Sequence, residues 1–328
     1  MPAIPCLALP ASCHKTGPTR VIPFDLSAHL GTGYPATSPN LLASYLRVCE
    51  GESLAVEATA TSQAFYAIRG TGCAESEHGT IHFGQGDLFV LPATKGPVTV
   101  SAERDTAVYH VSDAPLLQYL GVAPNQQKFQ ATHFTRERLL EFVEKISHEA
   151  GAEHRNRLGI LLGNDATHDS TKTLTHVLWS LLNMLPKETA QRPHRHNSVA
   201  LDLCVSAAAE GGVYTLMGPE LGVDGWVKDP VRLDWKEGAV FVTPPGWWHS
   251  HHNESGEPAW VLPMQDAGLY THQRTLDIRF APSTNSQAPA AAAAAAADKE
   301  EAAAAADKEA AAEAAAGPAA GKEAYIVG

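Results

Sequence analysis

Short β segments separated by glycine-containing breaks occupy residues 40 to about 121. The segments include LLASYLRV, AFYAIRGTGCAE and TAVYHVS, which are rich in β-branched and aromatic residues. The breaks suit the tight turns of an antiparallel barrel, and they contain Gly70, Gly72, Gly79, Gly84 and Gly86. The pattern predicts a β-rich first domain over residues 40–122, preceded by an N-terminal arm over residues 1–39.

A helical period replaces this pattern between Thr132 and Gly151. Thr135 is placed to cap the N-terminus of a helix. One apolar stripe follows at helical spacing, and it comprises Leu139, Leu140, Phe142, Val143 and Ile146. We therefore predict a helical linker over residues 123–172.

A second run of β segments begins near Thr173 and ends near Phe280. The order barrel, helix, barrel thus repeats along the chain. It predicts an all-β dominated fold with a second barrel over residues 173–282. Residues 283–328 are low-complexity and rich in alanine, with high helix propensity but no apolar face to bury. This tail is expected to be solvated and partly helical or disordered.

The composition is that of a soluble globular protein of 328 residues with a formal net charge of −12. Such acidity disfavours nucleic acid and anionic membrane surfaces as partners. No apolar run approaches the roughly 20 residues of a membrane helix, and the N-terminus lacks the basic region of a secretory signal. The five cysteines are scattered, as in reduced proteins, so a cytoplasmic location is predicted.

Two short motifs carry the candidate chemistry. The first is His194-Arg195-His196, and the second is GAVFVTPPGWWHSHHN, which contains His249. Residues two apart on a strand point to the same face, so His194 and His196 can both enter a barrel interior. The proline and glycine turn before His249 can aim a third imidazole there. Three imidazoles predict one divalent metal with coordination positions left open, as a catalytic site requires.

Both motifs resemble signatures of the cupin superfamily. The segment LNMLPKETAQRPHRHNSVALDL, followed by GGVYTLMG and VTPPGWWHSHHNESGEPAWVL, is similar to the bicupin ring-cleaving dioxygenases of the gentisate and salicylate 1,2-dioxygenase type. The resemblance implies two cupin barrels, each a double-stranded β-helix or jelly roll. It also implies Fe(II) bound by His194, His196 and His249, a small chelating substrate, and dioxygen at the last open position. Imidazole ligands alone suit Zn, Ni, Mn or Cu as well.

Two absences define this site further. Most cupins add a glutamate four or five residues after the second histidine, where this chain has Ala200 and Leu201. In the first barrel, Thr59 and Thr61 stand in place of the histidine pair, and Pro97 stands in place of the third histidine. The first barrel is therefore predicted to be a degenerate, metal-free copy with a scaffold or dimerisation role in a homodimer or higher homo-oligomer. Three of its histidines are predicted not to be ligands: His78, His82 and His110.

The arginine that the family uses for the substrate carboxylate is replaced here by Asp202. Strand alternation places Asp202 in the barrel interior, where it would repel a carboxylate. Asp202 could act as a general base, bind a hydroxyl or amine of another substrate, or pair with Arg192 or Arg274. The residues leave these alternatives open.

The residues around His249 complete the predicted site. Alternation places His251 on the same face as His249, as a hydrogen-bonding partner or proton shuttle, and turns His252 away. Trp247 and Trp248 are expected to form the apolar wall of an aromatic-binding pocket.

Three functions fit these residues. The first is a mononuclear Fe(II) dioxygenase that acts on a small aromatic or other chelating compound, and the aromatic wall and three-histidine set favour it. The second is a non-oxidative isomerase, lyase or decarboxylase that uses the metal as a Lewis acid, which Asp202 favours. The third is a non-catalytic protein in which the metal helps to bind a ligand.

Overall fold

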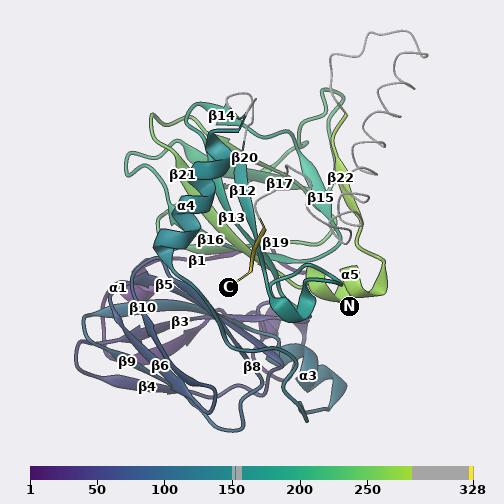
Figure 1. The fold of residues 1–328 in the computed structure, drawn as a ribbon. Coiled ribbons are helices and arrows are strands. Elements are labelled where there is room, and N and C mark those ends of the chain that lie inside the picture. Colours follow the sequence, from purple (N-terminus) through teal and green to yellow (C-terminus); the bar gives the residue numbers. More distant parts are fainter. Residues whose placement is uncertain (150–151, 153–156, 283–324, 328) are drawn as a thin grey trace.

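The computed structural model describes residues 1–149, 152, 157–282 and 325–327. It contains two β-barrels and few helices, so the predicted all-β dominated fold is confirmed. Figure 1 shows the second barrel above the first, with helix α4 (Arg136–Ser147) running along one side of the second. The predicted tail lies outside the described residues except for a short strand, β23 (Tyr325–Val327).

Two antiparallel sheets form the first barrel. Their strands are β2 (Arg20–Pro23), β3 (Leu42–Val48), β4 (Ser53–Val56), β5 (Ser62–Arg69), β6 (Gly72–Ser76), β7 (Gly79–Phe83), β8 (Leu88–Pro92), β9 (Val98–Ala102), β10 (Thr106–Ser112) and β11 (Thr132–Phe134). The six-stranded sheet has the order β11-β8-β5-β10-β3-β2, and the four-stranded sheet has the order β4-β9-β6-β7.

The second barrel has the same two-sheet construction. Its strands are β1 (Ala8–Leu9), β12 (Leu158–Gly163), β13 (Trp179–Leu185), β14 (Thr189–Ala190), β15 (His194–His196), β16 (Ala200–Ser206), β17 (Val213–Gly218), β18 (Val231–Asp234), β19 (Val240–Thr243), β20 (Trp248–Asn253), β21 (Ala259–Gln265) and β22 (Ile278–Phe280). The larger sheet has the order β1-β19-β16-β21-β13-β12-β23, and the smaller has the order β18-β17-β20-β15-β22, with β14 paired to β20.

The larger sheets of the two barrels match strand for strand. The series β11-β8-β5-β10-β3-β2 corresponds to the series β1-β19-β16-β21-β13-β12. The N-terminal arm supplies β1 to the second barrel and β2 to the first, and residues 123–172 supply β11 to the first barrel and β12 to the second. The arm and the linker therefore complete the sheets in addition to connecting them.

Five short α-helices accompany the sheets in the described part of the chain. Besides α4 they are α1 (Ser12–Lys15), α2 (Ser27–Leu30), α3 (Ala114–Leu120) and α5 (Ala267–Gln273). The predicted helix after Thr135 is confirmed: the Thr135 side chain accepts a hydrogen bond from Arg138 N, and Leu139, Val143 and Ile146 are buried. Among the described residues, no helix has the length and apolar character needed to cross a membrane.

Three apolar clusters hold the fold together. The largest lies between the barrels and includes Tyr45, Leu88, Leu201 and Leu262, together with the apolar stripe of α4. One smaller cluster fills the first barrel, and another fills the lower part of the second barrel around Trp235. Because neighbouring strand residues point to opposite faces, each large sheet contributes to the shared cluster with one face and to its own barrel with the other.

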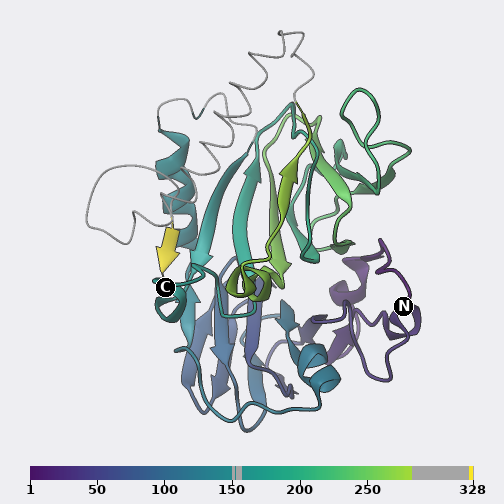
Figure 2. The same ribbon diagram turned by 90° about the vertical axis from the view of Figure 1, so that its right-hand side faces the viewer.

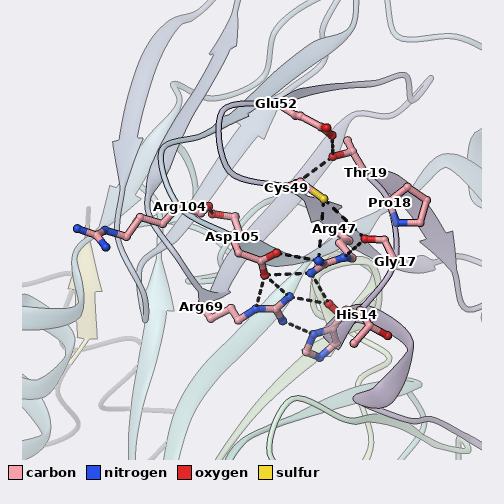
Figure 3. A network of polar contacts seen from close by, with 12 residues as sticks. His14, Gly17, Pro18, Thr19, Arg47, Cys49, Glu52, Arg69, Arg104 and Asp105 are labelled. Atoms are coloured by element: carbon pink, nitrogen blue, oxygen red, sulfur yellow. Dashed lines mark hydrogen bonds and ion pairs between the residues drawn. The ribbon is translucent and has the colours of Figure 1, made fainter.

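The N-terminal arm pairs with a strand of each barrel and lies where the two barrels meet, as Figure 2 shows. His14 in α1 bonds through Nε2 to the carbonyl of Gly238 in the second barrel, at 3.1 Å. On its other side, Arg69 of the first barrel lies 2.7 Å from His14 Nδ1. Asp105 accepts hydrogen bonds from Arg69 and from Arg47, and Figure 3 shows this network. The arm therefore connects charged groups of one barrel to the backbone of the other.

Candidate metal centre

Three histidines from two neighbouring strands of the second barrel converge. His194 and His196 lie on β15 with one residue between them, and β15 pairs with β20 so that His194 stands opposite His249. One ring nitrogen from each histidine lies within 4.8 Å of the others. After small ring rotations, nitrogens at this spacing can bind a single ion with bonds of roughly 2.1 Å. The trio predicted from the sequence is therefore brought together.

Hydrogen bonds hold two of these rings in the orientation that metal binding needs. His196 Nδ1 lies 2.9 Å from the carbonyl of Ser198, and His249 Nδ1 lies 3.0 Å from the carbonyl of Trp247. Because a carbonyl can only accept, each Nδ1 carries the hydrogen and each Nε2 keeps its lone pair for a metal. Ser198 in turn donates from Oγ to Gln265 Oε1 at 2.8 Å, which fixes the residue that orients His196.

Burial keeps these imidazoles neutral. Desolvation holds the pKa of His194 and of His249 well below the usual value, and the neighbouring imidazoles lower them further. Burial also lowers the pKa of His196. Since a metal ion binds only the unprotonated ring nitrogen, the trio is ready to bind metal at neutral pH without first releasing protons.

His251 lies beside the trio but outside it. Its ring centroid is 5.9 Å from that of His249, and its Nδ1 lies 2.8 Å from Thr215 Oγ1. The indole N–H of Trp235 donates to the same hydroxyl at 2.8 Å. Burial lowers the pKa of His251 to about 3. His252 points to the opposite face of β20, where it stacks on Tyr214 with centroids 4.8 Å apart.

Asp202 is buried inside the second barrel, 4 % exposed. Thr243 Oγ1 donates to Asp202 Oδ2 at 2.5 Å. Desolvation raises the pKa of Asp202 to about 7, although the Thr243 hydrogen bond opposes the rise. The two arginines considered as partners bond elsewhere among the described residues, Arg192 to the carbonyl of Pro282 and Arg274 to that of His272. The ion-pair alternative is therefore not formed.

The two tryptophans before His249 have different surroundings. Trp247 packs against the apolar cluster inside the second barrel. Trp248 lies on the other face of β20, where the guanidinium of Arg195 covers its ring at 4.9 Å. The structure thus places Trp247 against the barrel interior and Trp248 with Arg195 on the outside.

Two further residues of the second barrel were not identified from the sequence. Asn183 is 5 % exposed, and its Oδ1 has no hydrogen-bond partner among the described residues. Asn183 shares a face of β13 with Leu185, which belongs to the interior cluster, so it faces inward. Gly159 of β12 stands opposite Asn183, and a Cβ at Gly159 would lie 3.7 Å from Asn183 Oδ1. A buried amide oxygen without a partner is costly, and a bound ligand would satisfy it.

The second such residue is Arg157, which immediately precedes β12. Its side chain is exposed, and it lies outside the strand, two residues before Gly159. After burial, its positive charge is a further cause of the low pKa of His194, His249 and His251. Asn183 on β13 and Arg157 before β12 are remote from the motifs in sequence, and their places in the second barrel depend on the pairing of β12 with β13.

The first barrel has a different interior. The rings of Phe65 and Phe89 stack there at 4.8 Å, and Phe83 and His110 pack against them. His110 Nε2 lies 3.2 Å from Gln63 Oε1, and His78 bonds to the carbonyl of Ala93. Within the described part of the chain, the second-barrel trio is the only group of at least three His, Cys, Asp or Glu side chains placed to hold a metal ion.

Comparison with solved structures identifies the architecture. The salicylate 1,2-dioxygenase of Pseudaminobacter salicylatoxidans superposes with a TM-score of 0.65 at 14 % identity, covering 84 % of this chain and 88 % of that one. The fold is that of a bicupin. The same enzyme in its adducts with gentisate gives a TM-score of 0.65 at 12 % identity, covering 84 % of this chain and 85 % of the other chain.

The sequence resemblance is thereby confirmed at the level of the fold. No protein-family model matches this chain, and no curated protein matches it by sequence. Identities of 12 % to 14 % establish a shared architecture, whereas activity depends on the side chains of the individual site. The function must therefore be argued from the trio and its surroundings.

Proposed function

We propose that the second barrel of this bicupin is a mononuclear Fe(II) centre that catalyses a dioxygenase reaction on a small aromatic acid. The observation that carries the proposal is the histidine trio, whose ligand atoms lie within 4.8 Å of one another. Three protein ligands on one side of an ion leave positions for substrate and dioxygen. When bound, Fe(II) would supply those positions and the redox chemistry.

Three residues of the chain would contact or orient the substrate in this proposal. Arg157 provides the positive charge near the trio, and we assign to it the attraction of the substrate carboxylate. Asn183 Oδ1, which has no partner in the described part of the chain, can accept a hydrogen bond from a substrate hydroxyl or amine. Asp202 is buried on the face of β16 that points into the barrel, and its ionised form would repel a carboxylate. These charges orient an aromatic acid with its carboxylate towards Arg157.

Proton handling falls to His251 in this proposal. Its Nδ1 is hydrogen-bonded to Thr215 Oγ1, which in turn accepts from the indole N–H of Trp235, and Nε2 lies on the other side of the ring. The ring is neutral at pH 7, but its low pKa makes it a weak proton acceptor. Transfer to His251 therefore depends on a bound metal that would make the substrate hydroxyl more acidic.

Asp202 favours a second candidate function. A buried carboxylate with a pKa raised to about 7 can exchange a proton at neutral pH. An isomerase, lyase or decarboxylase that uses its metal as a Lewis acid needs such a group and no dioxygen. In that reaction Asp202, rather than His251, would move the proton.

The discriminating experiment is anaerobic reconstitution with Fe(II), followed by oxygen uptake with a panel of hydroxybenzoates, catechols and aminophenols. We expect uptake with at least one aromatic acid, and we expect His249→Ala to abolish both metal binding and uptake because one ligand of three is lost. Stoichiometric metal without uptake from any compound would sink the dioxygenase reaction and favour the non-oxidative one. Retention of stoichiometric metal in His194→Ala would contradict the ligand assignment.

A further inference from the structure

The three ligand histidines differ in what holds their rings. His196 and His249 are each fixed by a hydrogen bond from Nδ1 to a backbone carbonyl. His194 makes no such hydrogen bond among the described residues. Its ring instead stacks on Phe280, with centroids 5.8 Å apart and planes 24° from parallel. A ring contact therefore replaces the usual polar contact at this ligand.

The position of Phe280 is fixed by the strand that carries it. Strand β22 pairs with β15 so that Phe280 stands opposite His194. Beyond the end of β22, Ala281 N donates to the carbonyl of Pro193 at 2.7 Å. Before its start, Asp277 N donates to Asn197 Oδ1 at 2.9 Å. Contacts on both sides of Phe280 thus hold its ring against the metal ligand.

The exposure of Phe280 is unusual for its type. The side chain is 61 % exposed, on an edge strand of the smaller sheet. A large apolar ring in such a place gains little stability from burial. Ile278, two residues away on the same face, is 48 % exposed and pairs in register with His196. The interaction that distinguishes Phe280 is its stack on His194.

We propose that Phe280 is a positioning residue that holds the His194 imidazole ready for the metal. The inference rests on the proposed metal centre. An imidazole without a hydrogen bond at Nδ1 can rotate about its terminal torsion, and binding a metal then costs the ordering of that ring. Stacking on Phe280 restricts the rotation before the ion arrives. Contacts that orient a ligand in this way commonly change metal affinity by about 10-fold or more, and an aromatic pair alone accounts for a factor of about 3 to 10.

The test compares metal affinities of the full-length chain, measured by chelator competition with Co(II) and Zn(II). We expect Phe280→Leu, which keeps apolar bulk but loses the ring, to weaken binding about 3- to 10-fold. Phe280→Tyr should retain the wild-type affinity because the ring is kept. Ile278→Ala is the matched control, and it should stay within about 2-fold because His196 is held by its own hydrogen bond.

The Co(II) absorption spectrum gives a second readout of ligand geometry. It should change in Phe280→Leu and remain like the wild type in Phe280→Tyr. Equal affinities and spectra for wild type and Phe280→Leu would overturn the positioning role, and so would an equal loss in Ile278→Ala. A wild-type chain that binds neither ion would instead overturn the proposed metal centre. Unfolding midpoints of the metal-free variants separate a loss of fold from a loss of ligand orientation.

Discussion

His251 and His252 are adjacent in sequence, yet they have opposite roles in the structure. His251 lies with the metal ligands and bonds to Thr215, whereas His252 stacks on Tyr214 at the outer face. The difference follows from strand alternation, and it was predictable from the spacing to His249. The same alternation separates Trp247 from Trp248, which packs with Arg195. Whether a residue on β20 faces the metal ligands or the opposite side of the sheet therefore depends on whether its number is odd or even.

Arg157 provides a residue-level test of how the site recognises its substrate. Arg157→Gln keeps a polar side chain but removes the charge, and we expect KM for a hydroxybenzoate to rise by about 10-fold because a charge-assisted hydrogen bond is lost. KM for a catechol, which has no carboxylate, should change little. Steady-state oxygen uptake measures both constants. A similar rise for both substrates would mean that Arg157 does not bind the carboxylate.

The elements show which parts of the fold a sequence can predict. The helix after Thr135 and the strand with His194 and His196 were predictable because their patterns are local: a cap with an apolar stripe, and ligands two residues apart. Strands β1 and β12 were not identified as sheet members, because their pairing depends on partners far along the chain. Asn183 and Arg157 were missed for the same reason. The register of β12 against β13 determines their place, and no local pattern encodes it.

Helix α4 offers a prediction at the level of the element. Thr135 accepts the N-terminal hydrogen bond of this helix from Arg138 N, and Thr135→Ala removes the acceptor. The free energy of unfolding should fall by about 1 kcal/mol in this variant. In Thr135→Ser it should fall by less, because the serine hydroxyl can still accept the hydrogen bond. Urea denaturation of the three proteins measures the difference. Equal stabilities for Thr135→Ala and the wild type would show that the cap contributes nothing.

At the scale of the whole molecule, hydrogen bonds run in both directions between the two barrels. Asp266 of the second barrel accepts a hydrogen bond from Asn40, which precedes β3 of the first barrel. In the reverse direction, Thr175 precedes β13 and donates to Ser62 of the first barrel. The interior of one barrel is filled by aromatic rings and that of the other carries the histidine trio. The two barrels therefore have matching strand orders but different interiors. The first barrel can support the second through these contacts without containing a metal centre of its own.

The junction between the barrels should respond to acid through His14. This residue is buried between Arg69 and the carbonyl of Gly238, and it stacks edge-on against Tyr45. Desolvation is the main cause that lowers its pKa to about 4 from the usual 6.5, and the charge of Arg69 contributes. The folded chain therefore keeps His14 neutral at pH values where the unfolded chain protonates it.

The sign of the effect follows from this difference in proton binding. The contribution of His14 is fully present above its unfolded pKa of about 6.5, and it is lost progressively as the pH falls towards its folded pKa of about 4. Between pH 7 and pH 5 the loss amounts to about 2 kcal/mol. Because other buried groups titrate in this range, the measurement is a comparison of wild type with His14→Gln, whose amide can keep both hydrogen bonds. Urea unfolding measures the free energy of unfolding of each protein at pH 7 and at pH 5. The decrease between the two pH values should be larger for the wild type than for His14→Gln by about 2 kcal/mol. Equal decreases would show that His14 does not make the stability of the fold depend on pH.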